Sequence, residues 1–239
     1  MPFHLPLSPL DRRNQPPVYY LQVQDALILI SSFLWTVAYA LYVRQAFRDK
    51  SYGMPLLCLW ANIAWEFLFG VVAPTSAAQT IAFVPWLLID VAIVYTTWRF
   101  GPDQWKRSPL VANNMGWIVT SGTILMTGLF WSFIKTVGVE AASFYIGYGD
   151  QLLISITSVA QLMSRNNTSG HSLGIWFYRA SGTCLTILLF AWRYWHYADS
   201  YPRVAQPTTL FLFVGSEVVD SIYPMVYVFL EKKAKKKGT

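Results

Sequence analysis

The stretch TTLFLFVGSEVVDSIYPMVYVFL, residues 208–230, is apolar throughout except for a few polar side chains and two charged residues, Glu217 and Asp220. An α-helix rises about 1.5 Å per residue, so about 20 such residues cross the roughly 30 Å hydrocarbon core of a bilayer. Inside a bilayer every backbone polar group must be hydrogen-bonded within the protein, so that only α-helices and closed β-barrels can span it. The run lacks the alternating pattern of a barrel strand. The stretch therefore predicts a membrane-spanning helix.

Six more apolar runs of similar length precede this one. They lie at residues 25–46, 54–72, 81–99, 111–133, 139–163 and 172–194. Together the seven runs predict an all-α, polytopic membrane protein that folds as a seven-transmembrane-helix bundle. We expect one domain at 25–230, an N-terminal lumenal segment at 1–24 and a basic cytosolic tail at 231–239.

The composition supports this fold class. Of the 239 residues, 54% are hydrophobic and 17% aromatic, while only 13% are charged, against about 25% in soluble domains. These values exclude a disordered chain and a disulfide-rich secreted module, and they disfavour an ordinary water-soluble enzyme. The net charge of +6 is explained by cations at the ends of the apolar runs, so no nucleic-acid partner is expected.

The distribution of the cations predicts the orientation in the membrane. Twelve of the 18 Lys and Arg residues lie on the side that carries the C-terminus, against five on the other side. By the positive-inside rule, the N-terminus is lumenal and the C-terminus cytosolic. The last four residues, KKGT, resemble the dilysine signal that retrieves membrane proteins to the endoplasmic reticulum, and this predicts that location.

Several charged residues lie inside the apolar runs, where each costs about 2.5–3.5 kcal/mol on insertion scales. They are Glu66, Asp90, Asp150, Arg179, Glu217 and Asp220. Such groups face the interior of a bundle, and Asn62 lies one helical turn from Glu66. For Asp90 and Asp150 a structural hydrogen bond between helices is as good an interpretation as a functional role. Arg179 fits a structural partner or a side chain that reaches the interface.

Metal and phosphate chemistry have no signature in the sequence. The three histidines, His4, His171 and His196, lack ligand spacing, and Cys58 and Cys184 are isolated. No glycine-rich phosphate loop or nucleophile elbow is present, and no aspartate cluster exists to hold magnesium and a diphosphate. We therefore predict neither a metal nor a cofactor.

Six short stretches carry a family resemblance. They are SYGMPLL (51–57), NIAWE (62–66), WRFGP (98–102), YGDQLL (148–153), QLMSR (161–165) and VVDSIY (218–223). With these the chain resembles the integral-membrane terpene cyclases of fungal meroterpenoid and indole-diterpene biosynthesis. The resemblance implies a small seven-span enzyme of isomerase or lyase type in which Glu66 and Asp220 are the acidic residues needed for cyclisation. It also implies a lipophilic substrate, an epoxidised farnesyl or geranylgeranyl chain on an aromatic, polyketide or indole group. No role carries over to Asp150.

The chemistry of such a reaction fits buried carboxyls. Opening an epoxide requires a proton donor, and burial in an apolar bundle keeps a carboxyl in its neutral, protonated form. Either Glu66 or Asp220 is the general acid, and the other orients or tunes it. Aromatic faces stabilise a carbocation, and a dry cavity prevents water from quenching it. The residues predicted to bind substrate are Asn62, Trp65, Phe69, Asp90, Trp117, Tyr145, Tyr148, Glu217 and Tyr223.

The alternative is a seven-span transporter or receptor with buried acidic residues, because transporters also bury acids for proton coupling. Against it stand the lack of an inverted repeat and of helices broken by Gly or Pro in corresponding halves. A non-catalytic scaffold would leave both carboxyls without a role. Besides the substrate, the expected partner is membrane lipid; the oligomeric state is left open.

Overall fold

The computed structural model describes residues 4–237, and within this range every regular element is a helix. The elements, in chain order, are α1 (Pro9–Asn14), α2 (Val18–Asp49), α3 (Leu56–Phe67), η1 (Leu68–Val72), α4 (Ala77–Gln104), α5 (Pro109–Asn113), α6 (Met115–Val137), α7 (Val139–Arg165), α8 (Leu173–His196), η2 (Ala198–Ser200), η3 (Pro202–Ala205) and α9 (Pro207–Lys237). The predicted lumenal segment and dilysine signal extend into residues 1–3 and 238–239, which lie outside the described residues.

The N-terminal segment, expected at 1–24, contains helical residues. Ser8 and Asp11 form a capping box that starts α1, and the helix α2 begins directly after Pro17, seven residues before the expected 25. Hydropathy missed this start because Gln22 and Gln24 interrupt the apolar residues of its first turns. Gln24 and Asp25 are buried against the protein. Asp25 accepts a hydrogen bond from the backbone N–H of Leu5 at 2.6 Å. The segment is therefore held against the bundle.

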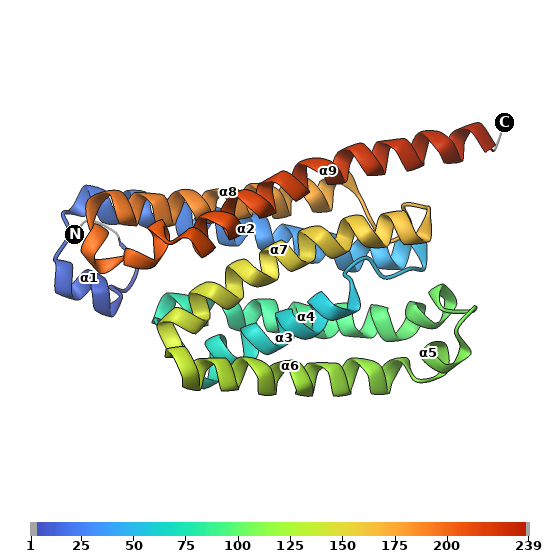
Figure 1. Ribbon diagram of the computed structural model, residues 1–239, viewed down its shortest axis with the longest axis horizontal. Coiled ribbons are helices and arrows are strands. Elements are labelled where there is room, and N and C mark those ends of the chain that lie inside the picture. Colours follow the sequence, from blue (N-terminus) through green and yellow to red (C-terminus); the bar gives the residue numbers. More distant parts are fainter. Residues whose placement is uncertain (1–3, 238–239) are drawn as a thin grey trace.

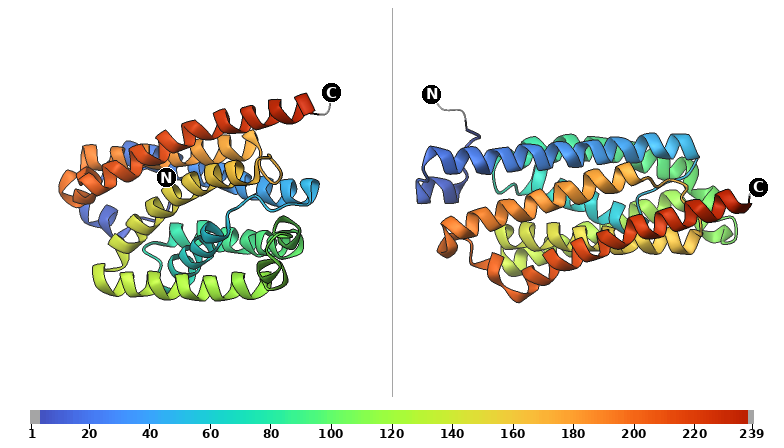
Figure 2. Two further views of the ribbon diagram at one scale, coloured as in Figure 1. Left: turned by 45° about the vertical axis from the view of Figure 1, so that its right-hand side comes forward. Right: turned by 90° about the horizontal axis from the view of Figure 1, so that it is seen from above.

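The long helices form two groups (Figure 1). In one group α3 packs against both α4 and α6, and in the other α2 runs along α8, which also contacts α9. Helix α7 crosses between the groups, in contact with α3, α6 and α9. Figure 2 shows the same arrangement from two further sides. The largest hydrophobic core lies within the first group and α7, and it contains the buried side chains of Leu59, Phe69 and Ile93.

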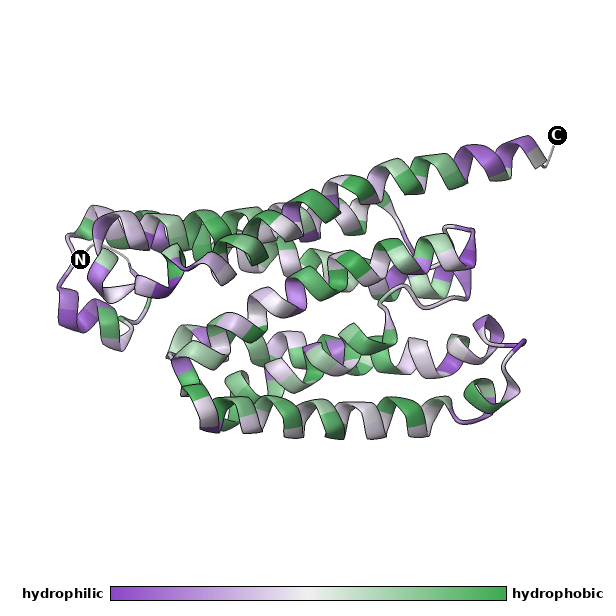
Figure 3. Ribbon diagram, in the orientation of Figure 1, coloured by the Kyte–Doolittle hydropathy of each residue, from purple (hydrophilic) through white to green (hydrophobic). Residues whose placement is uncertain are grey.

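Five helices, α2, α4, α6, α8 and α9, are long and apolar enough to cross a membrane. Apolar residues run along these helices (Figure 3), and many large ones are exposed on outer faces. They include Leu88, Val91, Ile124, Leu125, Phe211 and Met225. This surface suits lipid and not water. The prediction of an all-helical membrane protein is therefore confirmed.

The predicted count of seven spans is not confirmed. The expected span at 54–72 is α3 continued by the π-helical turn η1, and at Leu56–Val72 it is an apolar but shorter helix. The expected span at 139–163 is α7, which is long enough but is not among the five helices that are apolar enough to cross. The two departures have different causes: α3 with η1 falls short in length, whereas α7 carries buried polar side chains such as Gln151, Ser155 and Ser158.

The basic tail does not form a separate segment. Helix α9 continues unbroken to Lys237, and its end projects beyond the bundle (Figure 1). Alanine and lysine are good helix formers, so the polar tail extends the preceding helix. Lys233 Nζ donates to Asn166 Oδ1 at 3.0 Å, which ties the tail to the α7–α8 loop.

Candidate active site

The bundle encloses a cavity of about 360 Å³. We take as its mouth the end of the bundle that carries α1, η2 and η3, where the exposed Glu140 and the charged side chains of Arg193 and Arg203 line it. From Glu140 the cavity follows α7 to Ile154, about 20 Å along the helix at 1.5 Å per residue. A cavity of this size falls within the range of about 300–1,000 Å³ typical of small-molecule sites.

The middle of the cavity has aromatic walls. The aromatic residues that line it are Trp35, Trp65, Phe83, Trp86, Phe144, Tyr148, Phe190 and Tyr201. Trp65 is fixed by a hydrogen bond from its Nε1 to the carbonyl of Ser143, and it packs on Phe83 with ring centroids 4.3 Å apart. Gly147 permits this position, because a Cβ there would lie 2.8 Å from the indole ring. Glycine on α7 therefore lets a tryptophan of α3 form the wall.

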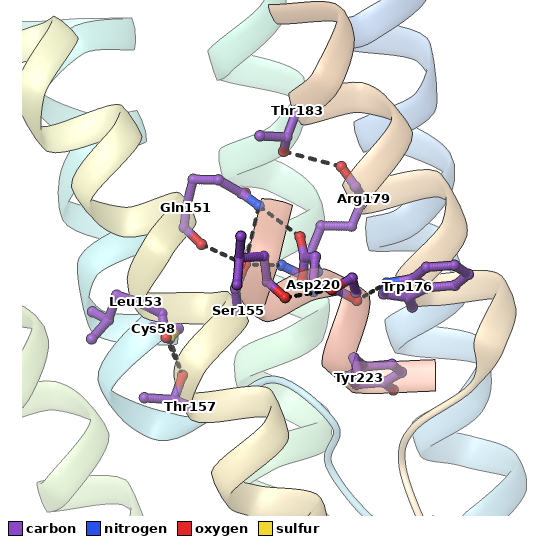
Figure 4. A network of polar contacts seen from close by, with 12 residues as sticks. Cys58, Gln151, Leu153, Ser155, Thr157, Trp176, Arg179, Thr183, Asp220 and Tyr223 are labelled. Atoms are coloured by element: carbon purple, nitrogen blue, oxygen red, sulfur yellow. Dashed lines mark hydrogen bonds and ion pairs between the residues drawn. The ribbon is translucent and has the colours of Figure 1, made fainter. Parts of the chain in front are cut away.

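The floor of the cavity is polar. It is lined by Tyr39 of α2, Cys58 and Asn62 of α3, and Asp150, Gln151 and Ile154 of α7. Cys58 and Thr157 approach to 2.9 Å and join α3 to α7 at this level (Figure 4). The cavity thus changes from an apolar tube to a set of hydrogen-bonding groups at its closed end.

Behind one side of the floor lies a cluster of two carboxyls. The Tyr39 hydroxyl is hydrogen-bonded to Glu66 Oε1 at 2.7 Å, and the amide nitrogen of Asn62 donates to Asp90 Oδ2 at 3.1 Å. The same amide lies 3.4 Å from Glu66 Oε1, so it serves both carboxyls, and it also contacts the Tyr39 hydroxyl. Glu66 and Asp90 are completely buried.

This first cluster has no positive charge to balance it. Within residues 4–237, neither Glu66 nor Asp90 forms an ion pair, and one oxygen of each, Oε2 and Oδ1, is buried without a hydrogen-bond partner. Two carboxylates that share one amide in an apolar interior repel each other, so at least one of the two carboxyls holds a proton. The cluster can therefore act as an acid.

Behind the other side of the floor lies an ion pair. The Arg179 guanidinium of α8 bonds directly to Asp220 Oδ1 of α9, and both residues are buried (Figure 4). Gln151 Nε2 donates to Asp220 Oδ2 at 3.2 Å, so both carboxylate oxygens are engaged. Arg179 also donates to Ser155 Oγ at 3.0 Å. Trp176 Nε1 completes the cluster by donating to the backbone carbonyl of Asp220 at 2.7 Å.

The two acids that the sequence singled out are therefore in different states. Glu66 lies beside another carboxyl, whereas Asp220 is ion-paired with the guanidinium of Arg179. Neither lines the cavity itself. Glu66 is connected to the cavity by its hydrogen bonds with Tyr39 and Asn62, and Asp220 is connected to it by the hydrogen bond from Gln151. Of the other residues predicted to bind substrate, Asn62, Trp65 and Tyr148 line the cavity, and Asp90 lies behind Asn62.

The remaining residues predicted to bind substrate, Phe69, Trp117, Tyr145, Glu217 and Tyr223, do not line this cavity. Phe69 is packed in the core, and Trp117 is exposed on the outer face of α6. The Tyr145 hydroxyl bonds to Gln206, and Glu217 is half-buried on α9 without reaching the cavity.

Tyr223 lies near the opposite end of the bundle from the mouth. Its hydroxyl is 3.1 Å from Nδ1 of His171, a residue of the α7–α8 loop. Burial lowers the pKa of His171 to about 3, so the imidazole is neutral, and the contact with Tyr223 is an ordinary hydrogen bond between neutral groups.

Sequence reasoning missed Tyr39 and did not assign a partner to Asp220. Tyr39 is one tyrosine among 14, with no motif around it, and only the packing of α2 against α3 brings it to Glu66. Arg179 did carry a signal, because it is an arginine inside an apolar run. Its partner could not be chosen from sequence among five carboxyls. Among residues 4–237, no group of three or more His, Cys, Asp or Glu side chains could hold a metal ion.

Comparison with known proteins shows the family of the chain. Residues 10–233 match the family described as Pyr4-like transmembrane terpene cyclases. The Pyr4-family terpene cyclase mfmH of Annulohypoxylon moriforme is 61% identical over 98% of this chain and 97% of its own. Terpene cyclase macJ of Penicillium terrestre is 36% identical over 93% and 88%, and terpene cyclase pyr4 of Aspergillus fumigatus is 28% identical over 82% and 83%. The chain belongs to the Pyr4-like transmembrane terpene cyclases.

Proposed function

We propose that this membrane terpene cyclase closes rings on an epoxidised prenyl chain carried by an aromatic, polyketide or indole group, and that a proton starts the reaction. The observation that carries the proposal is the aromatic cavity whose polar floor leads, through Tyr39 and Asn62, to the buried carboxyls of Glu66 and Asp90. An acid at the closed end of an apolar tube is what epoxide opening requires.

The polarity of the cavity orients the substrate. A prenyl chain with a terminal epoxide has one polar atom at its far end, so the epoxide oxygen belongs at the polar floor. The hydrocarbon chain then lies between the aromatic walls. The more polar head group stays at the mouth, near Glu140, Arg193 and Arg203. This orientation leaves no buried polar atom of the substrate without a partner.

The proton passes from Glu66 through Tyr39. Tyr39 lines the cavity, and its hydroxyl donates a hydrogen bond to Glu66 Oε1. When this hydroxyl turns to the epoxide oxygen, it donates its own proton there and takes up the proton of Glu66. The epoxide C–O bond breaks as the O–H bond forms. Successive alkenes then supply electron pairs for the new C–C bonds. The last cation loses a proton to water at the mouth and becomes an alkene, and Glu66 takes a proton back from water to start the next cycle. The reaction is an isomerisation, since one proton enters and one leaves.

Asp220 is not the acid in this scheme. It is ion-paired with Arg179, and the hydrogen bond that it accepts from Gln151 holds that side chain at the floor. We therefore assign the two roles that the sequence left open: Glu66 supplies the proton, and Asp220 positions Gln151. The aromatic walls stabilise the migrating cation by about 2 kcal/mol per ring when desolvated.

Product analysis tests the function. Microsomes that contain the chain expressed alone, in a host without related enzymes, are given farnesyl and geranylgeranyl epoxides on phenolic, polyketide and indole head groups. We expect ring-closed isomers of unchanged mass without added nucleotide or ion gradient. Unchanged epoxide in every reaction, or turnover only with an ion gradient, would overturn the proposed reaction.

We also propose that the chain crosses the membrane seven times. In addition to the five helices that are long and apolar enough to cross, α3 continued by η1 forms one span and α7 forms another. The low hydropathy of α7 has a local cause, because Gln151, Ser155 and Ser158 are buried on its inner side and lipid does not meet them. The cations predict a lumenal N-terminus and a cytosolic C-terminus in the endoplasmic reticulum.

Glycosylation tags at the two termini test this topology. A tag with an Asn-x-Thr sequon should gain a glycan at the N-terminus and remain unmodified at the C-terminus, because the sugar transferase acts in the lumen. The measurement is a gel shift that a glycosidase reverses. A glycan on the C-terminal tag would overturn the orientation, and glycans at both ends would overturn the odd number of spans.

A further inference from the structure

Asp150 is a carboxyl of the cavity floor that the proposed proton path does not use. It lies on α7 immediately before Gln151, and it lines the cavity. Its Oδ2 atom is buried without a hydrogen-bond partner among the described residues. A buried polar atom without a partner is costly, so a ligand that supplies one is stabilised there.

Asp150 differs from the other acids around the cavity. Glu66 and Asp90 lie behind the floor and are engaged by Tyr39 and Asn62. Asp220 is neutralised by Arg179. Asp150, in contrast, lines the cavity directly and forms no ion pair within residues 4–237.

The surroundings of Asp150 determine its chemical form. A carboxyl in an apolar bundle with no cation beside it is neutral, because the charged form would be neither solvated nor paired. A neutral carboxyl has one O–H group to donate. The floor therefore contains a hydrogen-bond donor on α7, in addition to those of Tyr39 and Asn62 on α2 and α3.

The reaction has a use for a second donor. When the epoxide C–O bond breaks, negative charge develops on the oxygen before the proton is fully transferred. Donors that are fixed in place stabilise such charge strongly in a site without water. With the head group at the mouth, the epoxide oxygen is the substrate atom that lies at the floor.

We propose that Asp150 contacts the substrate directly and, as a neutral acid, donates a hydrogen bond to the epoxide oxygen. Asp150 keeps its proton throughout, and the proton that is transferred comes from Glu66 through Tyr39. The inference rests on the proposed function and adds to it a residue on α7 that recognises the epoxide.

Two substitutions separate hydrogen bonding from proton transfer. The amide of Asp150→Asn still donates, so we expect kcat/KM within about tenfold of the wild-type value. Asp150→Leu has a similar volume and no donor, and we expect a loss of about 10²–10³, as for other donors to a developing oxyanion. Asp103→Asn, on the exposed end of α4, controls for a change of carboxyl to amide. Equal losses in both Asp150 variants, or no loss in Asp150→Leu, would overturn the proposal.

A binding measurement makes the test independent of turnover. The dissociation constant of each membrane preparation is measured for the epoxide and for the same prenyl chain without the epoxide oxygen. Asp150→Leu should weaken binding of the epoxide at least tenfold and leave binding of the other chain unchanged. Parallel weakening of both ligands would show a merely structural role and contradict the inference. If wild-type protein binds the epoxide but closes no rings, the proposed function fails, while the role of Asp150 is still decided by this comparison.

Discussion

Glu66→Gln is expected to abolish ring closure while the protein still folds and reaches the membrane. A general acid contributes about 10²–10⁴ to the rate, and glutamine has no proton to give. The amide is similar in size, and its oxygen can still accept the hydrogen bond of Tyr39. The loss should therefore appear in kcat, with little change in KM. The measurement is the yield of cyclised product at equal amounts of membrane protein.

Variants of the neighbouring residues sharpen this result. Tyr39→Phe removes the hydroxyl that lies between Glu66 and the cavity, and it should lower kcat as strongly as Glu66→Gln if the proton passes through it. The carboxyl-to-amide control is again Asp103→Asn, in an exposed ion pair with Lys106. Wild-type yield from Glu66→Gln would disprove the assignment of the acid. Normal turnover by Tyr39→Phe would disprove only the path through the tyrosine.

Much of the fold follows from hydropathy, because lipid imposes one requirement on every span. The expected runs at 81–99, 111–133 and 172–194 coincide with α4, α6 and α8. The method failed where polar residues face the protein interior. The start of α2 was placed too late because Gln22 and the buried Gln24 interrupt its first turns, and α7 is not among the five apolar candidates because its inner side is polar. Hydropathy averages around a helix and cannot separate these two sides.

The site was predictable only in part, for a similar reason. Acids in apolar runs stand out, so Glu66, Asp90 and Asp220 were found from the sequence. Aromatic residues do not stand out, because in a membrane both the lipid-facing and the cavity-facing sides of a helix are apolar. Trp65 and Trp117 are equally reasonable candidates by sequence, yet Trp65 lines the cavity and Trp117 is exposed on the outer surface. The pairing of acids with Tyr39 and Arg179 depends on the packing of helices distant in sequence.

Asp220→Asn is expected to cost both stability and activity, because it leaves the charge of Arg179 buried without its partner. Removing one member of a buried ion pair costs about 3–5 kcal/mol, which should lower the melting temperature of the detergent-solubilised protein by several degrees. Arg179→Met should be destabilised similarly, since it leaves the Asp220 carboxylate with Gln151 as its remaining side-chain partner.

The double variant Arg179→Met/Asp220→Leu separates the structural role of the pair from its role in the reaction. Apolar residues of similar volume often replace a buried ion pair with no loss of stability, so the melting temperature should return close to the wild-type value. Activity should not return, because the carboxylate that anchors Gln151 is gone. A double variant that is stable and closes rings at the wild-type rate would show that Asp220 serves only to hold α8 against α9. A stable but inactive one requires the carboxylate for the chemistry, even though Asp220 lies one side chain behind the cavity.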